Sequence, residues 1–295
     1  MSKTKLLVIV GPTASGKTGL AIALAQKFNG EVISADSRQV YQGLDIGSGK
    51  VTPEEMAGVT HHLIDIAYPE DNFSASDFKL AAQQAIAKIT KKGHLPIVAG
   101  GTGFYIKTLI DNVELPAIPP NQNLRRELDQ LATAELALRL KKLDEDRYKN
   151  VDIHNRPRLI RAIEIATVLG RVPVLAPTDS PFDLLQIGLY IPSTELNIKI
   201  HTRLMSWLKD GLINEVKHLK KQGVGPTRFK EFGLAYHFVY DYLEGKLTRD
   251  QMIAQSELSI RQYAKRQMTW FKQDKRIKWI TKPEEAEPLV KKFLG

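Results

Sequence analysis

A glycine-rich segment near the start of the sequence has the residue types that hold phosphate groups. The pattern GxxxxGK[ST] is formed by Gly11, Pro12, Thr13, Ala14, Ser15, Gly16, Lys17 and Thr18. In this pattern backbone N–H groups close around phosphate oxygens, the lysine adds positive charge and the last hydroxyl can bind Mg²⁺. An apolar run precedes the segment and a helical pattern follows it. We therefore expect a di- or triphosphate site with Thr18 as a metal ligand.

A carboxylate follows a second apolar run. Nucleoside triphosphatases usually hold their metal with an Asp at the end of a later strand, but here the run Leu95–Ala99 ends in Gly100, Gly101 and Thr102. Instead, Asp36 follows the run Glu31–Ser34. At a sheet edge beside the phosphate loop, Asp36 could be a general base or hold a ligand of the metal. It could equally cap a helix or close an Asx-turn.

The composition limits the chemistry that this chain can perform. Its 295 residues include no Cys, which excludes disulfides, thiolate catalysis and Cys-based zinc sites and leaves Mg²⁺ as the expected metal. His61 and His62 are adjacent and lack a third ligand at metal spacing, so we interpret both as structural. The net charge is +9, and Lys246–Lys282 holds ten basic and three acidic residues. That segment could bind a polyanion or could simply keep the surface soluble.

Apolar spacing predicts the elements that position these groups. We expect strands at Lys5–Val10, Glu31–Ser34, Leu95–Ala99 and Leu184–Ile191, helices at Lys17–Phe28 and Ser76–Lys91, and helical stretches over 121–168 and 196–271. The fold class is therefore α/β, a P-loop NTPase-like parallel sheet core with an inserted all-helical domain and a helical C-terminal region. The expected domains are a first part of the core at 1–116, the inserted helical domain at 117–182, and core completion with the basic helical region at 183–295.

Several longer motifs resemble one known family. In order they are GPTASGKT, SADSRQVYQGLDIGSGK, HHLIDI, FSASDF, VAGGTGFYI and RQYAKRQMTWF. Together, from about Leu6 to Trp279, they resemble the tRNA dimethylallyltransferases, or IPP transferases. The resemblance implies transfer of a dimethylallyl group from dimethylallyl diphosphate to N6 of adenosine 37 in the tRNA anticodon loop, with release of pyrophosphate. The phosphate loop would then hold the diphosphate leaving group, with Mg²⁺ on Thr18.

The resemblance also implies roles for individual residues. Asp36 would accept the N6 proton, Thr102 would orient the reacting groups, and Arg203 would clamp the diphosphate, although Arg203 could also be an ordinary surface residue. The implied tRNA-binding residues are Asp36, Ser37, Arg38, Gln39, Thr102, Arg126, Arg158, Arg161, Arg261 and Lys265. We expect Tyr263, Trp270 and Phe271 to pack the core rather than to stack on bases. The segment Phe229–His237 departs from the family pattern at a place expected near the tRNA.

An alternative function uses the same phosphate loop. A small-molecule kinase of the nucleoside or shikimate type also pairs this loop with an Asp after the second strand, but it needs no polyanion surface. No apolar run approaches the roughly 20 residues required to cross a bilayer. We therefore expect a cytoplasmic monomer that binds tRNA and dimethylallyl diphosphate and makes no membrane contact.

Overall fold

The computed structural model describes residues 3–295 and divides into two compact units. Unit 1 is Met1–Asn112 together with Asp179–Gly295, and unit 2 is Val113–Thr178. Unit 2 is one continuous stretch of chain inserted between the two parts of unit 1. Its bounds, 113–178, are close to the expected range of 117–182. In the described residues, no helix is long and apolar enough to span a membrane.

A parallel sheet forms the base of unit 1. Its strands in the described residues are β1 (Thr4–Val10), β2 (Gly30–Ser34), β3 (His61–His62), β4 (Leu95–Gly100), β5 (Phe182–Leu189) and β6 (Ile277–Ile280), in the order β3-β2-β4-β1-β5-β6. The register pairs Val10 with Gly100 and Ser34 with Ala99. Consequently β1, β2 and β4 end side by side, and the segments that follow them meet at one edge.

The central strands form because their side chains are apolar on both faces. Leu6 to Val10 of β1 are fully buried, as expected for a strand in a sheet that is covered on both faces. Three helices in the first part of the chain connect the strands or follow them: α1 (Lys17–Lys27), α3 (Ala75–Lys91) and α4 (Gly103–Ile110), with a short α2 (Pro53–Met56) in the connection before β3.

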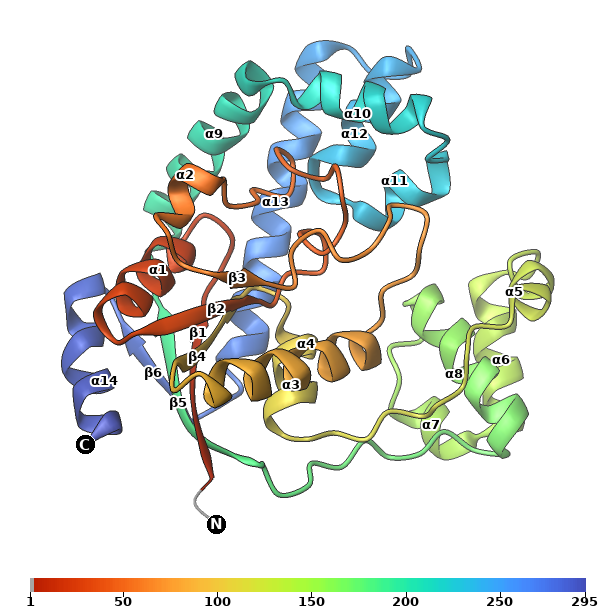
Figure 1. The fold of residues 1–295 in the computed structure, drawn as a ribbon. Coiled ribbons are helices and arrows are strands. Elements are labelled where there is room, and N and C mark those ends of the chain that lie inside the picture. Colours follow the sequence, from red (N-terminus) through yellow and green to blue (C-terminus); the bar gives the residue numbers. More distant parts are fainter. Residues whose placement is uncertain (1–2) are drawn as a thin grey trace. The chain divides into compact units, whose positions relative to one another are not determined.

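The helices after β5 form a second cluster in unit 1. They are α9 (Ser193–Asp210), α10 (Leu212–Lys221), α11 (Pro226–Phe232), α12 (Leu234–Leu243) and α13 (Arg249–Phe271), followed by the 3₁₀ turn Pro283–Glu285 and α14 (Ala286–Leu294). Figure 1 shows α9 to α12 beyond the end of the sheet toward which β1 runs. Two breaks that we did not predict, at Gly211 and Gly233, have φ values of 109° and 64°, which glycine adopts most readily.

Unit 2 is wholly helical in secondary structure. Its helices are α5 (Gln122–Leu128), α6 (Thr133–Leu143), α7 (Glu145–Lys149) and α8 (Arg156–Leu169). They share an apolar cluster around Leu128, Leu136 and Leu159. The α/β fold class, with a parallel sheet and a helical insertion, is confirmed. The short strands β3 and β6 and the helices α2 and α14 were not predicted.

Candidate active site

The phosphate loop connects β1 to α1 and turns sharply at its end. Gly16 precedes the helix with φ 85°, a left-handed conformation that favours glycine. Lys17 begins α1, and its Nζ donates to the carbonyl of Pro12 at 3.0 Å, so its side chain folds back over the loop. Ser15 Oγ is buried without a hydrogen-bond partner. The loop therefore holds the ammonium of Lys17 in a fixed position and leaves the hydroxyl of Ser15 without a hydrogen bond.

The charge on Lys17 is sensitive to its surroundings. The pKa of its ammonium is lowered from 10.5 to about 8, chiefly by burial; the charge of Asp36 opposes this effect, and the positive charge of Arg203 adds to it. Since the charges of Asp36 and Arg203 both act on Lys17, the turn after β2, the start of α1 and the middle of α9 lie near one another. Three of the residues predicted for the site are thus brought together.

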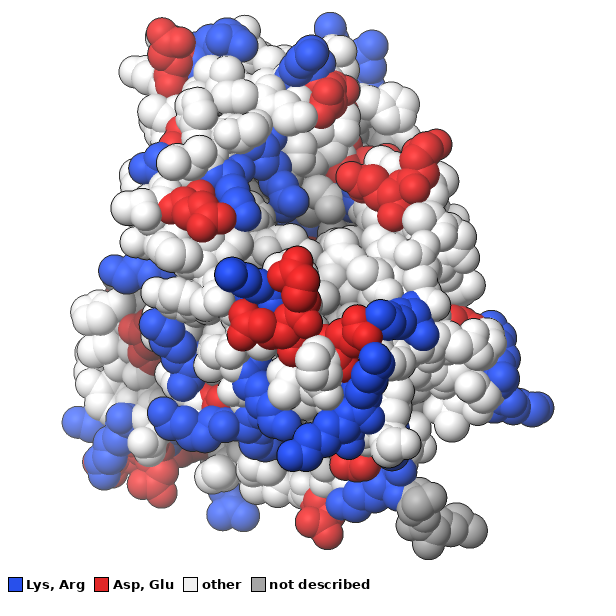
Figure 2. Space-filling view, turned by 90° about the vertical axis from the view of Figure 1, so that its left-hand side faces the viewer, with Lys and Arg blue, Asp and Glu red and all other residues white. Residues whose placement is uncertain are grey.

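A cleft of about 1240 Å³ opens beside the loop. Lys17, Thr18 and Arg203 contribute polar groups to its lining, and Arg203 has no hydrogen-bond or ion-pair partner within residues 3–295. Its apolar lining includes Ile22, Ile46, Met56, Ile198 and Trp207. Figure 2 looks onto the face that carries α1, α2 and α9 and shows Lys and Arg side chains around a hollow. The cleft therefore offers both cationic and apolar side chains to a ligand.

The residues present fit a magnesium ion that is shared with a phosphate ligand. The described part of the chain contains no group of three or more His, Asp or Glu side chains able to hold a metal by themselves. Mg²⁺ commonly takes one or two protein oxygens and completes its shell with phosphate oxygens and water. The Thr18 hydroxyl, in the lining of the cleft, can supply such an oxygen.

Asp36 and Thr102 lie on neighbouring strand ends. Thr102 Oγ1 accepts a hydrogen bond from the backbone N–H of Ser37 at 3.1 Å, and its own N–H donates to the Ala35 carbonyl. Asp36 Oδ1 accepts from the backbone N–H of Arg38 at 2.9 Å, so the Asx-turn is present. One carboxylate oxygen shapes the turn, which leaves the other for a substrate.

The two glycines before Thr102 are required by close packing. A Cβ on Gly100 would lie 2.2 Å from the carbonyl oxygen of Ala35, and one on Gly101 would lie 2.0 Å from the Gln267 amide. Gln267, on α13, is a residue that sequence reasoning missed. Its Oε1 accepts from the N–H of Thr13 at 2.7 Å, and its Nε2 donates to the Gly101 carbonyl at 2.9 Å. One buried amide thus joins the phosphate loop to the turn that carries Thr102.

Two residues predicted to read the base make contacts inside the protein. Arg38 Nε donates to the Phe232 carbonyl at 2.6 Å, and its guanidinium lies 4.8 Å from the centre of the Tyr263 ring. Gln39 accepts from Ser34 Oγ and donates to the Gly49 carbonyl. In this structure these side chains hold the Asp36 turn in place, and their role in RNA recognition stays a prediction.

The other predicted RNA-binding residues differ in their exposure and in the partners of their side chains. Arg261 and Lys265 are exposed one turn apart on α13, although Arg261 also pairs with Glu257. Within unit 2, Arg158 and Arg126 are exposed, and Arg126 donates a hydrogen bond to its neighbour Asn123. Arg161 instead binds the buried Glu164 and the Ile118 carbonyl. Arg161 thus stabilises unit 2 itself.

The aromatic residues pack largely as expected. Phe271 is buried, and the half-buried Trp270 meets Phe104 edge-on at 6.4 Å. The unusual segment Phe229–His237 forms parts of α11 and α12 and has Phe229 and Tyr236 fully buried.

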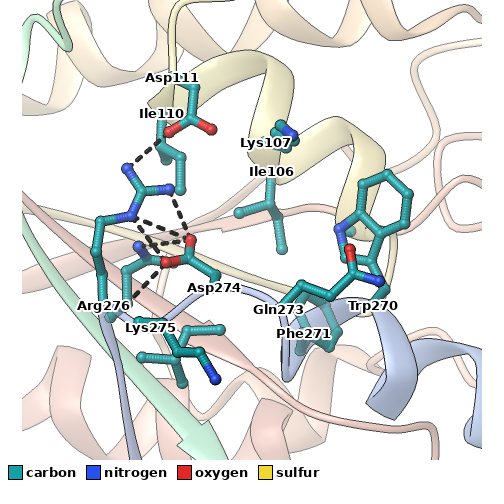
Figure 3. A pocket seen from close by; sticks show the side chains of 13 residues that line it. Ile106, Lys107, Ile110, Asp111, Trp270, Phe271, Gln273, Asp274, Lys275 and Arg276 are labelled. Atoms are coloured by element: carbon teal, nitrogen blue, oxygen red, sulfur yellow. Dashed lines mark hydrogen bonds and ion pairs between the residues drawn. The ribbon is translucent and has the colours of Figure 1, made fainter. Parts of the chain in front are cut away.

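A second pocket of about 250 Å³ lies between α4 and the end of α13. Figure 3 shows Arg276 at one side of it, paired with Asp111 at 2.7 Å and with Asp274 at 2.6 Å. Asp274 also accepts from Gln186. The charge of Arg276 is therefore already paired, and the lining of this pocket includes no residue of the phosphate loop. The cleft beside the phosphate loop is the candidate active site.

Comparisons with known proteins agree with this geometry. The family model described as IPP transferase matches residues 39–274. The tRNA dimethylallyltransferase of Pediococcus pentosaceus is 43% identical, over 98% of this chain and 96% of the relative. The crystal structure of the full-length tRNA isopentenylpyrophosphate transferase of Bacillus halodurans has a TM-score of 0.75 and 37% identity, and the match covers 99% of this chain and 97% of that one.

A solved eukaryotic dimethylallyltransferase described as acting on tRNA has a TM-score of 0.73 and 28% identity, over 91% of this chain and 70% of that one. The sequence match and the structural match both extend over nearly the whole chain. This chain belongs to the IPP transferase family.

Proposed function

We propose that this protein transfers the dimethylallyl group of dimethylallyl diphosphate to N6 of adenosine 37 in the tRNA anticodon loop. The observation that carries the proposal is a cleft lined by Lys17, Arg203 and apolar side chains, with Asp36 near enough to act on the charge of Lys17. Two cations suit a departing diphosphate, and the apolar side chains suit a five-carbon chain. The family and the names of its relatives support the same activity.

In the proposed reaction the C1–O bond of the donor breaks and a C1–N6 bond forms. Negative charge builds up on the pyrophosphate as it leaves, and Lys17, Arg203 and the loop N–H groups stabilise that charge. When bound at Thr18, Mg²⁺ would supply further positive charge to the same oxygens. N6 loses a proton as the new bond forms, and Asp36 accepts or orients that proton.

The acceptor adenine must leave the stacked anticodon loop to reach this edge of the sheet. Extruding a base costs a few kcal/mol, so contacts elsewhere on the RNA have to compensate. Arg261 and Lys265 on α13, with Arg126 and Arg158 in unit 2, supply exposed charge for the phosphates. The protein is proposed to act in the cytoplasm as a monomer.

The direct test is incubation of the protein with Mg²⁺, dimethylallyl diphosphate and an unmodified tRNA that carries adenosine at position 37. Nucleosides from the digested RNA are then analysed by mass spectrometry. We expect one dimethylallyl group on that adenosine, and none when position 37 is changed to guanosine. Unmodified adenosine in the presence of a folded enzyme would contradict the proposal.

A further inference from the structure

One carboxylate outside the proposed reacting groups binds a row of backbone amides. Glu215, on α10, accepts hydrogen bonds from the N–H groups of Asp45 at 3.0 Å, Ile46 at 2.6 Å and Gly47 at 3.1 Å. The hydroxyl of Tyr236 donates to the same carboxylate at 2.8 Å. Successive N–H groups that point to one place form an anion-binding arrangement, and here the protein's own side chain occupies it.

The amides that Glu215 holds belong to a wall of the donor cleft. Ile46, Gly49 and Lys50 line that cleft. A Cβ on Gly49 would lie 3.3 Å from the Trp207 ring and 3.8 Å from the Arg203 guanidinium. A shift of this segment would therefore change the space around Arg203, although Glu215 is absent from the lining of the cleft.

The hydrogen bonds of Glu215 join this wall to the helical cluster, in addition to the apolar packing of Ile46 against it. The ammonium of Lys50 donates to the Tyr41 carbonyl at 2.9 Å and pairs with Asp45 and Asp65, so it joins the wall to its own neighbours. Tyr236, which donates to Glu215, is fully buried and packs closely against the same wall. A Cβ on Gly47 would lie 2.7 Å from its ring.

We propose that Glu215 is a positioning residue for the prenyl-donor site, acting through the amides of residues 45–47. This inference rests on the proposed function in naming the donor. Replacing the carboxylate with an amide puts an N–H₂ group against a row of N–H donors, which cannot all be satisfied. The wall then moves away from Arg203, and the site for the diphosphate loosens while the RNA-binding surface on α13 does not change.

The test compares Glu215→Gln with Glu244→Gln, a matched change at a surface pair with Lys220. We expect Glu215→Gln to raise the KM for dimethylallyl diphosphate roughly 10- to 100-fold, as for a displaced positioning group, and to leave the KM for tRNA within about twofold. Affinity for inorganic pyrophosphate should fall in parallel, and hydrogen exchange at the amides of residues 45–47 should speed up. Glu244→Gln should match the wild type in all three measurements.

Tyr236→Phe provides a second variant if Glu215→Gln does not fold. It removes one hydrogen bond to the carboxylate and should change the same quantities in the same direction, by less. Unchanged donor KM and pyrophosphate affinity in a folded Glu215→Gln protein would overturn the inference, as would equal rises in both KM values. Pyrophosphate binding and hydrogen exchange need no prenyl transfer, so they test the inference even if the wild-type enzyme fails to modify tRNA.

Discussion

Lys17 carries the charge on which the proposed leaving-group stabilisation depends most. Its pKa is lowered to about 8, whereas phosphate esters complete their ionisation near pH 6. Above about pH 8, diphosphate binding must therefore bring a proton to Lys17. We expect the dissociation constant of dimethylallyl diphosphate to be flat between about pH 7 and 8 and to rise up to tenfold for each further pH unit.

Isothermal titration calorimetry from pH 6.5 to 9.5 measures this dependence. Lys17→Arg is the control, because a guanidinium stays protonated throughout the range and its binding, although weaker, should not change with pH. A wild-type profile that stays flat to pH 9.5 would show that Lys17 is not the group that titrates.

Asp36 has a structural role and a proposed chemical role, and one substitution separates them. Asn can accept the same hydrogen bond from the Arg38 N–H and is a good residue for such a turn, but it cannot take a proton. We expect Asp36→Asn to lower kcat by about 10²–10⁴ with nearly unchanged melting temperature and tRNA affinity. The measurement is single-turnover transfer at saturating substrates beside a thermal melt. Near-normal turnover in a folded variant would refute the assignment of Asp36 as proton acceptor.

Site residues could be predicted from the sequence where a local pattern of residues marks them. The phosphate loop follows from fixed spacing, and Asp36 and Thr102 follow from the rule that parallel strands end at one edge. Gln267 and Glu215 could not be predicted in this way. Their partners are backbone groups 254 and up to 170 residues away in the sequence, and an amide or carboxylate that binds distant backbone leaves no periodic signal. Gln267 lies within the motif RQYAKRQMTWF. The charged residues of that motif indicate RNA contacts and its aromatic residues indicate core packing, but nothing in the motif distinguishes the glutamine.

At the scale of elements, α13 combines two tasks on opposite sides. Gln267 faces the active site and is buried, whereas Arg261 and Lys265 are exposed. If the exposed side binds RNA phosphates, log K for tRNA should fall with log salt by about 0.7–0.9 per phosphate contact. We expect the double variant Arg261→Ala, Lys265→Ala to weaken tRNA binding and to reduce that slope by up to about 2, with little effect on donor affinity.

Fluorescence anisotropy between 50 and 300 mM salt measures the slope. The matched control is Lys217→Ala with Lys221→Ala, an exposed pair at the same four-residue spacing on α10. If both double variants reduce the slope equally, α13 contributes only to net charge.

The sheet depends on a buried carboxylate at its other end. Glu31 is the second residue of β2. Its carboxylate accepts from Lys92 at 2.9 Å and lies 2.7 Å from a ring nitrogen of each of His62 and His94. Burial raises the pKa of Glu31, but these hydrogen bonds outweigh burial and lower it from 4.5 to about 2. Between those values the unfolded chain binds more protons than the folded one. The stabilisation is therefore complete above about pH 4.5 and is lost as the pH falls toward 2.

We expect Glu31→Gln to lower the free energy of unfolding at pH 7 by about 1–3 kcal/mol. The difference from the wild type should shrink as the pH falls below 4.5, which urea denaturation at several pH values measures. Glu70→Gln, an exposed change in the same unit, is the control. A difference between Glu31→Gln and wild type that does not depend on pH would contradict the assigned ionisation.

Long elements were predicted more reliably than short ones. The strand at 95–99 and the helix at 76–91 each lie within one residue of the observed bounds, because each has a clear apolar period. Strand β3 has two residues and β6 has four, which is too short for a period to appear. The breaks at Gly211 and Gly233 depend on how the helices pack against each other, and single glycines within an apolar pattern do not reveal that.

At the scale of the whole molecule, a phosphate site in unit 1 is proposed to act on a large RNA substrate. The phosphate loop is proposed to hold a leaving group, so that prenyl transfer needs no nucleoside triphosphate. The kinase alternative requires the opposite. One reaction mixture that contains enzyme, Mg²⁺, dimethylallyl diphosphate and an adenosine-37 tRNA separates the two.

The measurement is the ratio of pyrophosphate released to prenylated adenosine formed, with and without ATP. We predict a ratio of one, no dependence on ATP and no ADP, and loss of both products together in Lys17→Ala. Formation of ADP in proportion to product, or pyrophosphate released without prenylated adenosine, would contradict the claim.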